Sequence, residues 1–227
     1  MNPALEVATL AAMLFFFSAI AYKNKSLDYE GIAVGNIIGI AMYLAGGMIA
    51  FVTTVIFYGV AESSTLFARK NTEKKISKHE KRTTSNIIGN SGAALIALIL
   101  GSWIGFFGAF SAALADTLSS EIGLLSKRKP KLITNFQEVE PGSNGGVTLI
   151  GFMAALAGAL IIAGFYFFLF HNLKISIIII IAGFTGSVVD SILGATLERK
   201  KIINNTMVNF IGSSSGALIA IGLSFLI

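Results

Sequence analysis

The sequence predicts an all-α fold, a polytopic membrane bundle of about eight transmembrane helices, within a range of roughly seven to nine. Two observations lead to this class. Hydrophobic residues make up 54% of the 227 residues and charged residues only 13%, and the mean hydropathy is +0.77. A soluble domain carries about twice that share of charge. Residues 1–227 are therefore expected to form a single transmembrane domain with no separate soluble part.

The predicted helices follow the apolar stretches of the chain in order. Two stretches, 31–69 and 84–125, are too long for single spans, so we divide them at Gly46-Gly47 and near Gly101-Ser102. The first stretch is followed, not preceded, by lysines and is expected to be an uncleaved anchor. The predicted spans are 3–21, 31–46, 47–69, 84–101, 102–125, 147–170, 175–198 and 205–225.

The distribution of basic residues predicts the topology. Of the 17 lysine and arginine residues, all except Lys174 fall in the loops 22–30, 69–83, 126–145 and 199–205, which this division places on one side. Lysine and arginine concentrate in the cytoplasmic loops of membrane proteins. We therefore expect an integral cell-membrane protein with cytoplasmic loops at about 70–83, 126–145 and 199–205, and with both termini extracytoplasmic.

Acidic residues within the apolar stretches mark the candidate site. Asp116, Glu121 and Asp190 lie in segments expected to enter the membrane, where ionisable groups are costly and usually face a polar cavity. The chain has no cysteine, so a metal ion would be held by oxygen ligands, which favour Mg²⁺ or Mn²⁺. These three acids are the predicted catalytic and metal-binding residues.

An internal similarity pairs the two aspartates. The segment SAALADTLSSE at 111–121 resembles TGSVVDSILGA at 185–195, and aligning the two superposes Asp116 on Asp190. At roughly 100° per residue, small polar residues share a helix face with Asp116, and asparagines recur on two further helices. The predicted polar stripes include Thr117, Ser120, Asn86, Asn90 and Asn209, with Arg82 one turn before Asn86. Close packing of small residues is the alternative explanation for the glycine and serine positions.

The hexapeptide PGSNGG at 141–146 predicts a phosphate-binding turn at the start of a helix. Its glycines permit backbone conformations closed to other residues, and Ser143 or Asn144 is expected to cap the span that begins near Val147. Free N–H groups at a helix start bind anions, so alanine at Gly145 or Gly146 should impair phosphate binding with little loss of stability. A simple turn and cap is the alternative. The candidate ligands are Gly142, Ser143, Asn144, Gly145 and Gly146.

The basic segment before this turn supplies positive charge for a phosphate. The segment from Lys127 to Lys131 and Arg82 hold the candidate ligands, with Lys129 and Lys131 selected from the segment, while topology accounts for the other basic residues. For that reason no nucleic-acid partner is expected. Neither a GxxxxGK[ST] nor a GxGxxG motif occurs, which excludes a soluble-type nucleotide domain at the level of motif.

Several of these motifs resemble those of a known membrane family. ADTLSSEIG at 115–123, PKLIT at 130–134, VEPGSNGGVTLIG at 139–151 and GSVVDSILGATLE at 186–198 resemble the integral membrane family that includes the phytyl-phosphate kinases of plants and cyanobacteria. That family has many uncharacterised archaeal and bacterial members and is distantly similar to membrane CTP-dependent prenol kinases and CDP-diacylglycerol synthases. Arg82, Asn86 and Asn90 fit its R-x-x-x-[QN]-x-x-x-N pattern.

The resemblance implies a membrane kinase that converts a prenyl monophosphate, such as phytyl or geranylgeranyl phosphate, to the diphosphate. A nucleoside triphosphate, with CTP expected, would be the donor, and Mg²⁺ or Mn²⁺ the cofactor. Asp116 and Asp190 would hold the metal ion and Gly142 to Gly146 the phosphates. The isoprenoid tail would lie between apolar helices, with the active site facing the cytoplasm.

Two other functions stay open at the level of sequence. One is a cytidylyltransferase that forms a CDP-linked lipid, although the chain lacks the SPKKTxEG signature of those synthases. The other is an ion-coupled transporter, since glycine-rich helices and intramembrane acids also mark carriers. A homodimer is left open as well.

Overall fold

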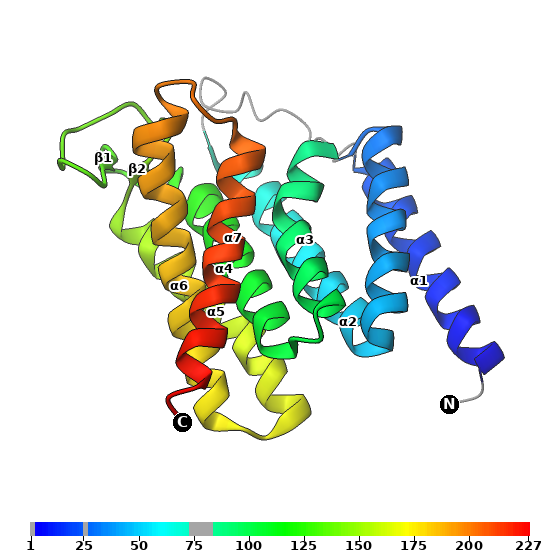
Figure 1. The fold of residues 1–227 in the computed structure, drawn as a ribbon. Helices are drawn as coiled ribbons and strands as arrows, with labels where there is room; N and C mark the ends of the chain where they lie inside the picture. Colours follow the sequence, from blue (N-terminus) through cyan, green and yellow to red (C-terminus); the bar gives the residue numbers. More distant parts are fainter. Residues whose placement is uncertain (1–2, 25–26, 73–83) are drawn as a thin grey trace.

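The computed structural model describes residues 3–24, 27–72 and 84–227, and these are mostly helical (Figure 1). This confirms the predicted all-α class. A two-stranded antiparallel sheet, β1 (Lys131–Leu132) and β2 (Gly146–Val147), is the exception in the described residues. The helices are α1 (Pro3–Lys23), α2 (Tyr29–Asn71), α3 (Thr84–Ile99), α4 (Trp103–Gly123), α5 (Leu149–Phe170), α6 (Leu173–Leu193), the π-helical turn η1 (Gly194–Glu198) and α7 (Asn205–Ser224).

Both predicted divisions of the long apolar stretches occur. Gly47 interrupts α2 with φ 62° and ψ −158°, a conformation that glycine adopts without a Cβ clash, and Figure 1 shows the chain reversing there. Ser102 separates α3 from α4 and caps α4, because its Oγ accepts a hydrogen bond from the N–H of Gly105 at 3.1 Å. Gly47 thus breaks the first stretch and Ser102 starts a new helix in the second, both at the predicted positions.

The number of membrane spans is supported only in part. Within the described residues, five helices are long and apolar enough to cross a membrane: α1, α2, α5, α6 with η1, and α7. The apolar α3 is shorter, at 16 residues. The structure therefore supports an integral membrane protein with several spans, and the count of eight stays a prediction.

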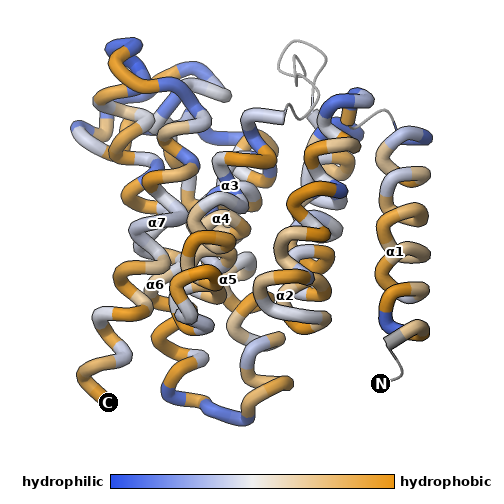
Figure 2. The backbone as a smooth tube through the Cα atoms, turned by 45° about the vertical axis from the view of Figure 1, so that its right-hand side comes forward, coloured by the Kyte–Doolittle hydropathy of each residue, from blue (hydrophilic) through white to orange (hydrophobic). Residues whose placement is uncertain are grey.

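The loops and the chain ends lie at opposite ends of the bundle. In Figure 1 the start of α1 and the end of α7 are at one end, and the loops 124–148 and 199–204 are at the other. Figure 2 shows hydrophilic residues gathered at the loop end, with a smaller group at the turn between α5 and α6, where Lys174 lies. This arrangement agrees with the predicted division of the loops into two sides, although it does not identify the cytoplasmic side.

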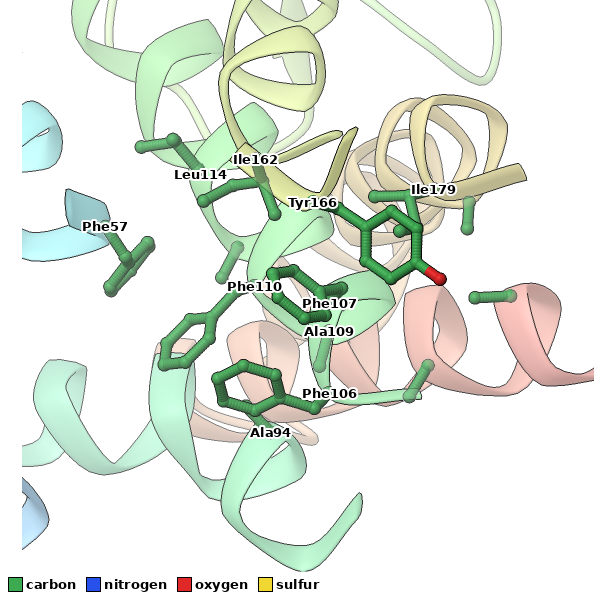
Figure 3. Close-up of a cluster of buried hydrophobic side chains, with 14 of the residues drawn as sticks. Phe57, Ala94, Phe106, Phe107, Ala109, Phe110, Leu114, Ile162, Tyr166 and Ile179 are labelled. Carbon is green, nitrogen blue, oxygen red and sulfur yellow. The ribbon is translucent and has the colours of Figure 1, made fainter. Parts of the chain in front are cut away.

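The core is built around α4, which packs against α2, α3, α5, α6 and α7. Phe106, Phe107 and Phe110 of α4 are fully buried, and the Phe110 ring lies 5.0 Å from that of Phe57 on α2 (Figure 3). Tyr166 of α5 meets the Phe107 ring edge-on at 5.0 Å. This aromatic cluster fixes the position of α4, whose other end carries Asp116.

Small residues let α4, α6 and α7 approach one another closely. A Cβ added to Gly108 would lie 2.7 Å from the carbonyl oxygen of Gly216, and one added to Gly186 would lie 2.9 Å from that of Gly212. Such contacts are typical of helix packing in membranes. Close packing therefore explains these glycines, as the alternative interpretation of the sequence proposed, and it brings the aspartate-bearing helices together.

Candidate functional site

A polar cavity of about 880 Å³ lies between the helix ends and the loop 124–148. Its walls come from α2, α3, α4, α6, η1 and α7, with the loop across the end of the bundle. The cavity brings together most of the residues that the sequence singled out. These are Asn86, Asn90, Asp116, Thr117, Ser120, Glu121, Gly142, Ser143, Asn144, Gly145, Gly146, Asp190 and Asn209. Arg82 lies outside the described residues.

The carboxyl groups of Asp116 and Asp190 face each other across the contact between α4 and α6. They are close enough to interact electrostatically, and both side chains are half-buried because they line the cavity. Gly212 of α7 packs directly on Asp190, since a Cβ at that position would lie 3.0 Å from its Oδ2. Two like charges this close repel, so neutralisation of one carboxylate by a proton or a cation would stabilise the pair.

A third acid, Glu198, reaches the same cavity from η1. The chain widens there into a π-helical turn, in which the N–H of Arg199 donates to the carbonyl oxygen of Gly194 at 3.3 Å. Such turns are frequent at functional sites. The Glu198 carboxyl lies close enough to both aspartates to interact with them electrostatically. Sequence analysis did not select Glu198 as a site residue, although it shares a helix face with Asp190.

Glu121 lines the cavity but is engaged elsewhere. The Oγ1 of Thr65, on α2, donates a hydrogen bond to Glu121 Oε1 at 2.8 Å. Among the described residues, no three acidic, histidine or cysteine side chains lie close enough to hold a metal ion together. The structure thus does not bring Glu121 into one ligand group with the two aspartates.

The asparagines of α3 and α7 complete the wall opposite the loop. Asn86, Asn90 and Asn209 all line the cavity, and Asn205 Nδ2 donates to Asn86 Oδ1 at 3.3 Å. The backbones are close here, because a Cβ on Gly89 would lie 2.9 Å from the carbonyl oxygen of Thr206. These amides offer both donors and acceptors to a ligand in the cavity.

The loop 124–148 is folded by its own hydrogen bonds. Lys131 pairs with Val147 and Leu132 with Gly146, and the N–H of Ile133 donates to the Gly145 carbonyl oxygen at 3.1 Å. Leu132 is buried beneath the loop. These contacts hold the PGSNGG turn over the cavity.

The cap predicted for the following helix is wrong in position. The α5 cap is Thr148, whose Oγ1 accepts from the N–H of Gly151 at 3.0 Å, and not Ser143 or Asn144. The physical reason is that Gly146 and Val147 pair with β1, so the chain stays extended and the helix starts later. The sequence gives no local sign of this pairing.

Two glycines of the turn pack against η1. Gly145 has φ +72°, and a Cβ there would overlap the backbone of Ala195; one on Gly194 would lie 2.9 Å from the Gly145 nitrogen. A Cβ on Gly146 would also be tight, at 3.0 Å from the carbonyl oxygen of Ser143. The expectation that alanine at Gly145 would leave stability nearly unchanged is therefore wrong, whereas the same expectation for Gly146 stays a prediction.

The turn still offers donors to an anion. The backbone N–H groups of Asn144 and Gly145 make no hydrogen bond within the described part of the chain. Gly142 and Gly145 both have positive φ, a conformation that glycine adopts readily in tight turns. The turn therefore has the features of an anion site as well as a packing role.

Among the described residues, Arg128 is the basic residue that lines the cavity, and the two predicted lysines lie outside the lining. Lys131 is exposed because residues alternate along β1 and its neighbour Leu132 takes the buried position. Lys129 is exposed on the loop. Alternation in a two-residue strand cannot be read from the sequence, so the sequence alone did not show which residue of the basic run lines the cavity.

Acidic groups outnumber basic ones in the described lining. The lining includes the acidic residues Asp116, Glu121, Glu140, Asp190 and Glu198 and one basic residue, Arg128. A bare polyphosphate would be repelled, whereas one carrying divalent cations would not. Further lining residues that the sequence-based site did not include are Thr65, Ser119, Arg128, Glu140, Thr148, Ser191, Glu198 and Asn205.

Comparisons with known proteins identify relatives along the whole chain. Residues 12–217 match the family described as Integral membrane protein DUF92. The Uncharacterized membrane protein MJ0933 of Methanocaldococcus jannaschii is 33% identical over 236 residues, covering 96% of this chain and 98% of that protein. Protein PGR of Arabidopsis thaliana is 30% identical, with coverage of 78% and 74%. Protein VTE6, chloroplastic, of the same plant is 26% identical, with coverage of 97% and 72%. No solved structure matches the chain.

Replacing Gly145 by alanine should destabilise the protein more than replacing Gly142. Both residues have positive φ, +72° and +82°, so alanine strains the backbone at either position by about 1–3 kcal/mol. At Gly145 a Cβ would also overlap the Ala195 backbone, whereas at Gly142 it would meet only Leu124 Cδ2 at 4.0 Å. The melting temperature of Gly145→Ala should therefore be the lower of the two in detergent. Equal melting temperatures would show that the turn is not held against η1.

Proposed function

The chain belongs to the integral membrane family DUF92, and from that premise we propose that it is a membrane kinase that phosphorylates a prenyl monophosphate to the diphosphate. A nucleoside triphosphate, with CTP expected, is the donor, and phytyl or geranylgeranyl phosphate is the expected acceptor. The observation that carries this proposal is the Asp116–Asp190 pair in a polar cavity at the end of an apolar bundle. The motif resemblance to phytyl-phosphate kinases supplies the reaction class.

The aspartate pair fits a Mg²⁺ or Mn²⁺ ion. Proteins usually bind Mg²⁺ through one or two carboxylates, with substrate phosphates and water as the other ligands. Asp116 and Asp190 provide such a pair and face a cavity large enough for phosphates. A third protein ligand is not required, which agrees with the separate engagement of Glu121 by Thr65. When bound, the ion would offset charge on the donor phosphates.

The protein groups around the pair suit phosphoryl transfer. An oxygen of the acceptor phosphate forms the new bond to the γ-phosphorus while the bond from that phosphorus to the β-bridging oxygen breaks, and the nucleoside diphosphate leaves. A phosphate monoester is largely ionised near neutral pH, so its oxygen needs no general base. Arg128 and the unused N–H groups of Asn144 and Gly145 would bind phosphate oxygens.

The position of the acids favours an enzyme over a carrier. Secondary transporters place their coupling acids near the bilayer midplane. In this chain Asp116 and Asp190 share a cavity with the loop residues Glu140 and Asn144, so the site lies at the end of the bundle. Such a position lets a water-soluble nucleotide reach a lipid phosphate at the membrane surface.

Label transfer from CTP tests the proposed reaction. Purified protein incubated with Mg²⁺, phytyl phosphate and CTP labelled at the γ-phosphorus should give labelled lipid, and CTP labelled at the α-phosphorus should not. Incorporation of the α-label would instead indicate a cytidylyltransferase. Transfer of neither label, with protein that retains its cooperative melting, would exclude both CTP-dependent reactions with this acceptor.

The same assay tests the two aspartates. Asp116→Asn and Asp190→Asn should each lower label transfer by about 100-fold or more, the equivalent of roughly 3 kcal/mol of lost charge stabilisation. Asp28→Asn is the matched control, because Asp28 caps α2 outside the cavity and asparagine caps a helix equally well. Near-normal transfer by either cavity variant would contradict the assignment.

We also propose that the cavity opens toward the cytoplasm, as the basic loops indicate. The chain has no cysteine, so Gln137→Cys and Lys174→Cys each introduce one labelling site, at opposite ends of the bundle. In sealed cells an impermeant maleimide should react with Lys174→Cys and reach Gln137→Cys only after the membrane is opened. The reverse pattern would place the site outside, and labelling of both in sealed cells would contradict the two-sided arrangement.

A further inference from the structure

A second cavity, of about 300 Å³, also borders α2 and lies beside the polar one. It is a groove between α1, the two halves of α2 and Ile87 of α3, and most of its lining is apolar. The lining runs along α1 from Leu14 to Asn24, which corresponds to about 15 Å of helix. An elongated apolar groove of this size can hold a large part of a small lipid chain.

The groove changes from apolar to polar along its length. At one end Leu14, Gly39 and Phe51 line it, whereas Asn24, Glu62 and Ser63 line it near the loop end of the bundle. The Cβ of a residue at position 39 would lie 3.1 Å from Leu14 Cδ2, so side chains close the apolar end. This gradient matches an amphiphile whose tail points into the membrane and whose headgroup points toward the loops.

Two glycines leave open space in the groove wall. A Cβ added to Gly35 or Gly59 would meet no other heavy atom within 4 Å, and both residues line the groove. Neither has a positive φ, so their backbone does not require glycine. The missing side chains therefore leave room for a ligand without serving helix packing or a turn.

The groove and the polar cavity share a wall. Glu62 lines the groove and Thr65, one turn later on α2, lines the cavity; on α3, Ile87 lines the groove and Asn86 the cavity. Farther from the loop end, the Tyr58 hydroxyl lies 2.7 Å from Ser91 Oγ, and this hydrogen bond joins α2 to α3. A molecule that occupies both spaces would cross the wall near the loop end.

The charge of Glu62 decides which part of a lipid the groove holds. Its Oε1 is buried and has no hydrogen-bond partner among the described residues. A carboxylate there disfavours an anionic headgroup. The groove therefore suits the tail of a phosphorylated lipid, with the phosphate beyond Glu62 in the polar cavity.

We infer that the groove between α1 and α2 binds the isoprenoid tail of the acceptor lipid and thereby sets its preferred chain length. This inference rests on the proposed kinase function, which supplies the chemical class of the tail. The groove lies between the outermost helix and its neighbour, so the tail can enter laterally from the bilayer (Figure 1).

Filling the open space tests the inference. Gly35→Phe and Gly59→Phe should raise the KM for geranylgeranyl phosphate at least tenfold while leaving the KM values for dimethylallyl phosphate and CTP unchanged. Gly164→Phe on α5 is the matched control, because a Cβ there also meets nothing within 4 Å but the residue does not line the groove. Unchanged selectivity between the two acceptors in both groove variants would overturn the inference while leaving the kinase proposal intact.

Crosslinking gives a readout that does not depend on turnover. A geranylgeranyl phosphate with a diazirine at the end of its tail should label peptides of α1 and α2 in the wild-type protein, with less labelling in Gly59→Phe and in the presence of excess phytyl phosphate. Labelling confined to α5 and α6 would contradict the groove assignment. Labelling of α1 and α2 without any phosphoryl transfer would retain the tail site and reject the kinase.

Discussion

The pairing of two carboxyl groups inside an apolar helical bundle is the constraint on which the rest of the structure depends. Asp116 and Asp190 come from α4 and α6, and they meet because small residues let these helices and α7 approach closely. Below them the phenylalanine cluster of α4 fixes that helix against α2 and α5. An unneutralised pair of charges between apolar helices would be costly, so a proton or a cation would stabilise this arrangement.

The loop 124–148 closes one end of the cavity that contains this pair. Its strands hold the PGSNGG turn over the cavity, and the glycines of the turn contact the backbone of η1 directly. Excess acid in the described lining disfavours a bare anion, while Arg128 and two unused N–H groups offer positions for phosphate oxygens. Divalent cations and phosphates together satisfy this combination of charges better than either does alone.

Much of this organisation could be predicted from the sequence, because hydropathy and helix breakers act locally. The breaks at Gly47 and before Trp103, the pairing of the two aspartates and the polar stripes all followed from local patterns. The motif resemblance to an integral membrane family is confirmed by the match over residues 12–217.

The features that could not be predicted from the sequence depend on contacts between segments that are distant in the chain. Strand pairing moved the α5 cap to Thr148 and turned Lys131 away from the cavity. The Thr65 to Glu121 hydrogen bond joins residues 56 positions apart, which no helical periodicity could reveal.

Nucleotide binding to the aspartate pair is tested most directly by the thermal stability of purified protein with CTP, with and without Mg²⁺. At about 100 times its Kd, a ligand stabilises the folded state by roughly 2.7 kcal/mol. CTP should raise the melting temperature of the wild type only when Mg²⁺ is present and should not raise that of the Asp116→Asn/Asp190→Asn double variant, whereas equal stabilisation of both proteins would contradict a metal–nucleotide site at this pair.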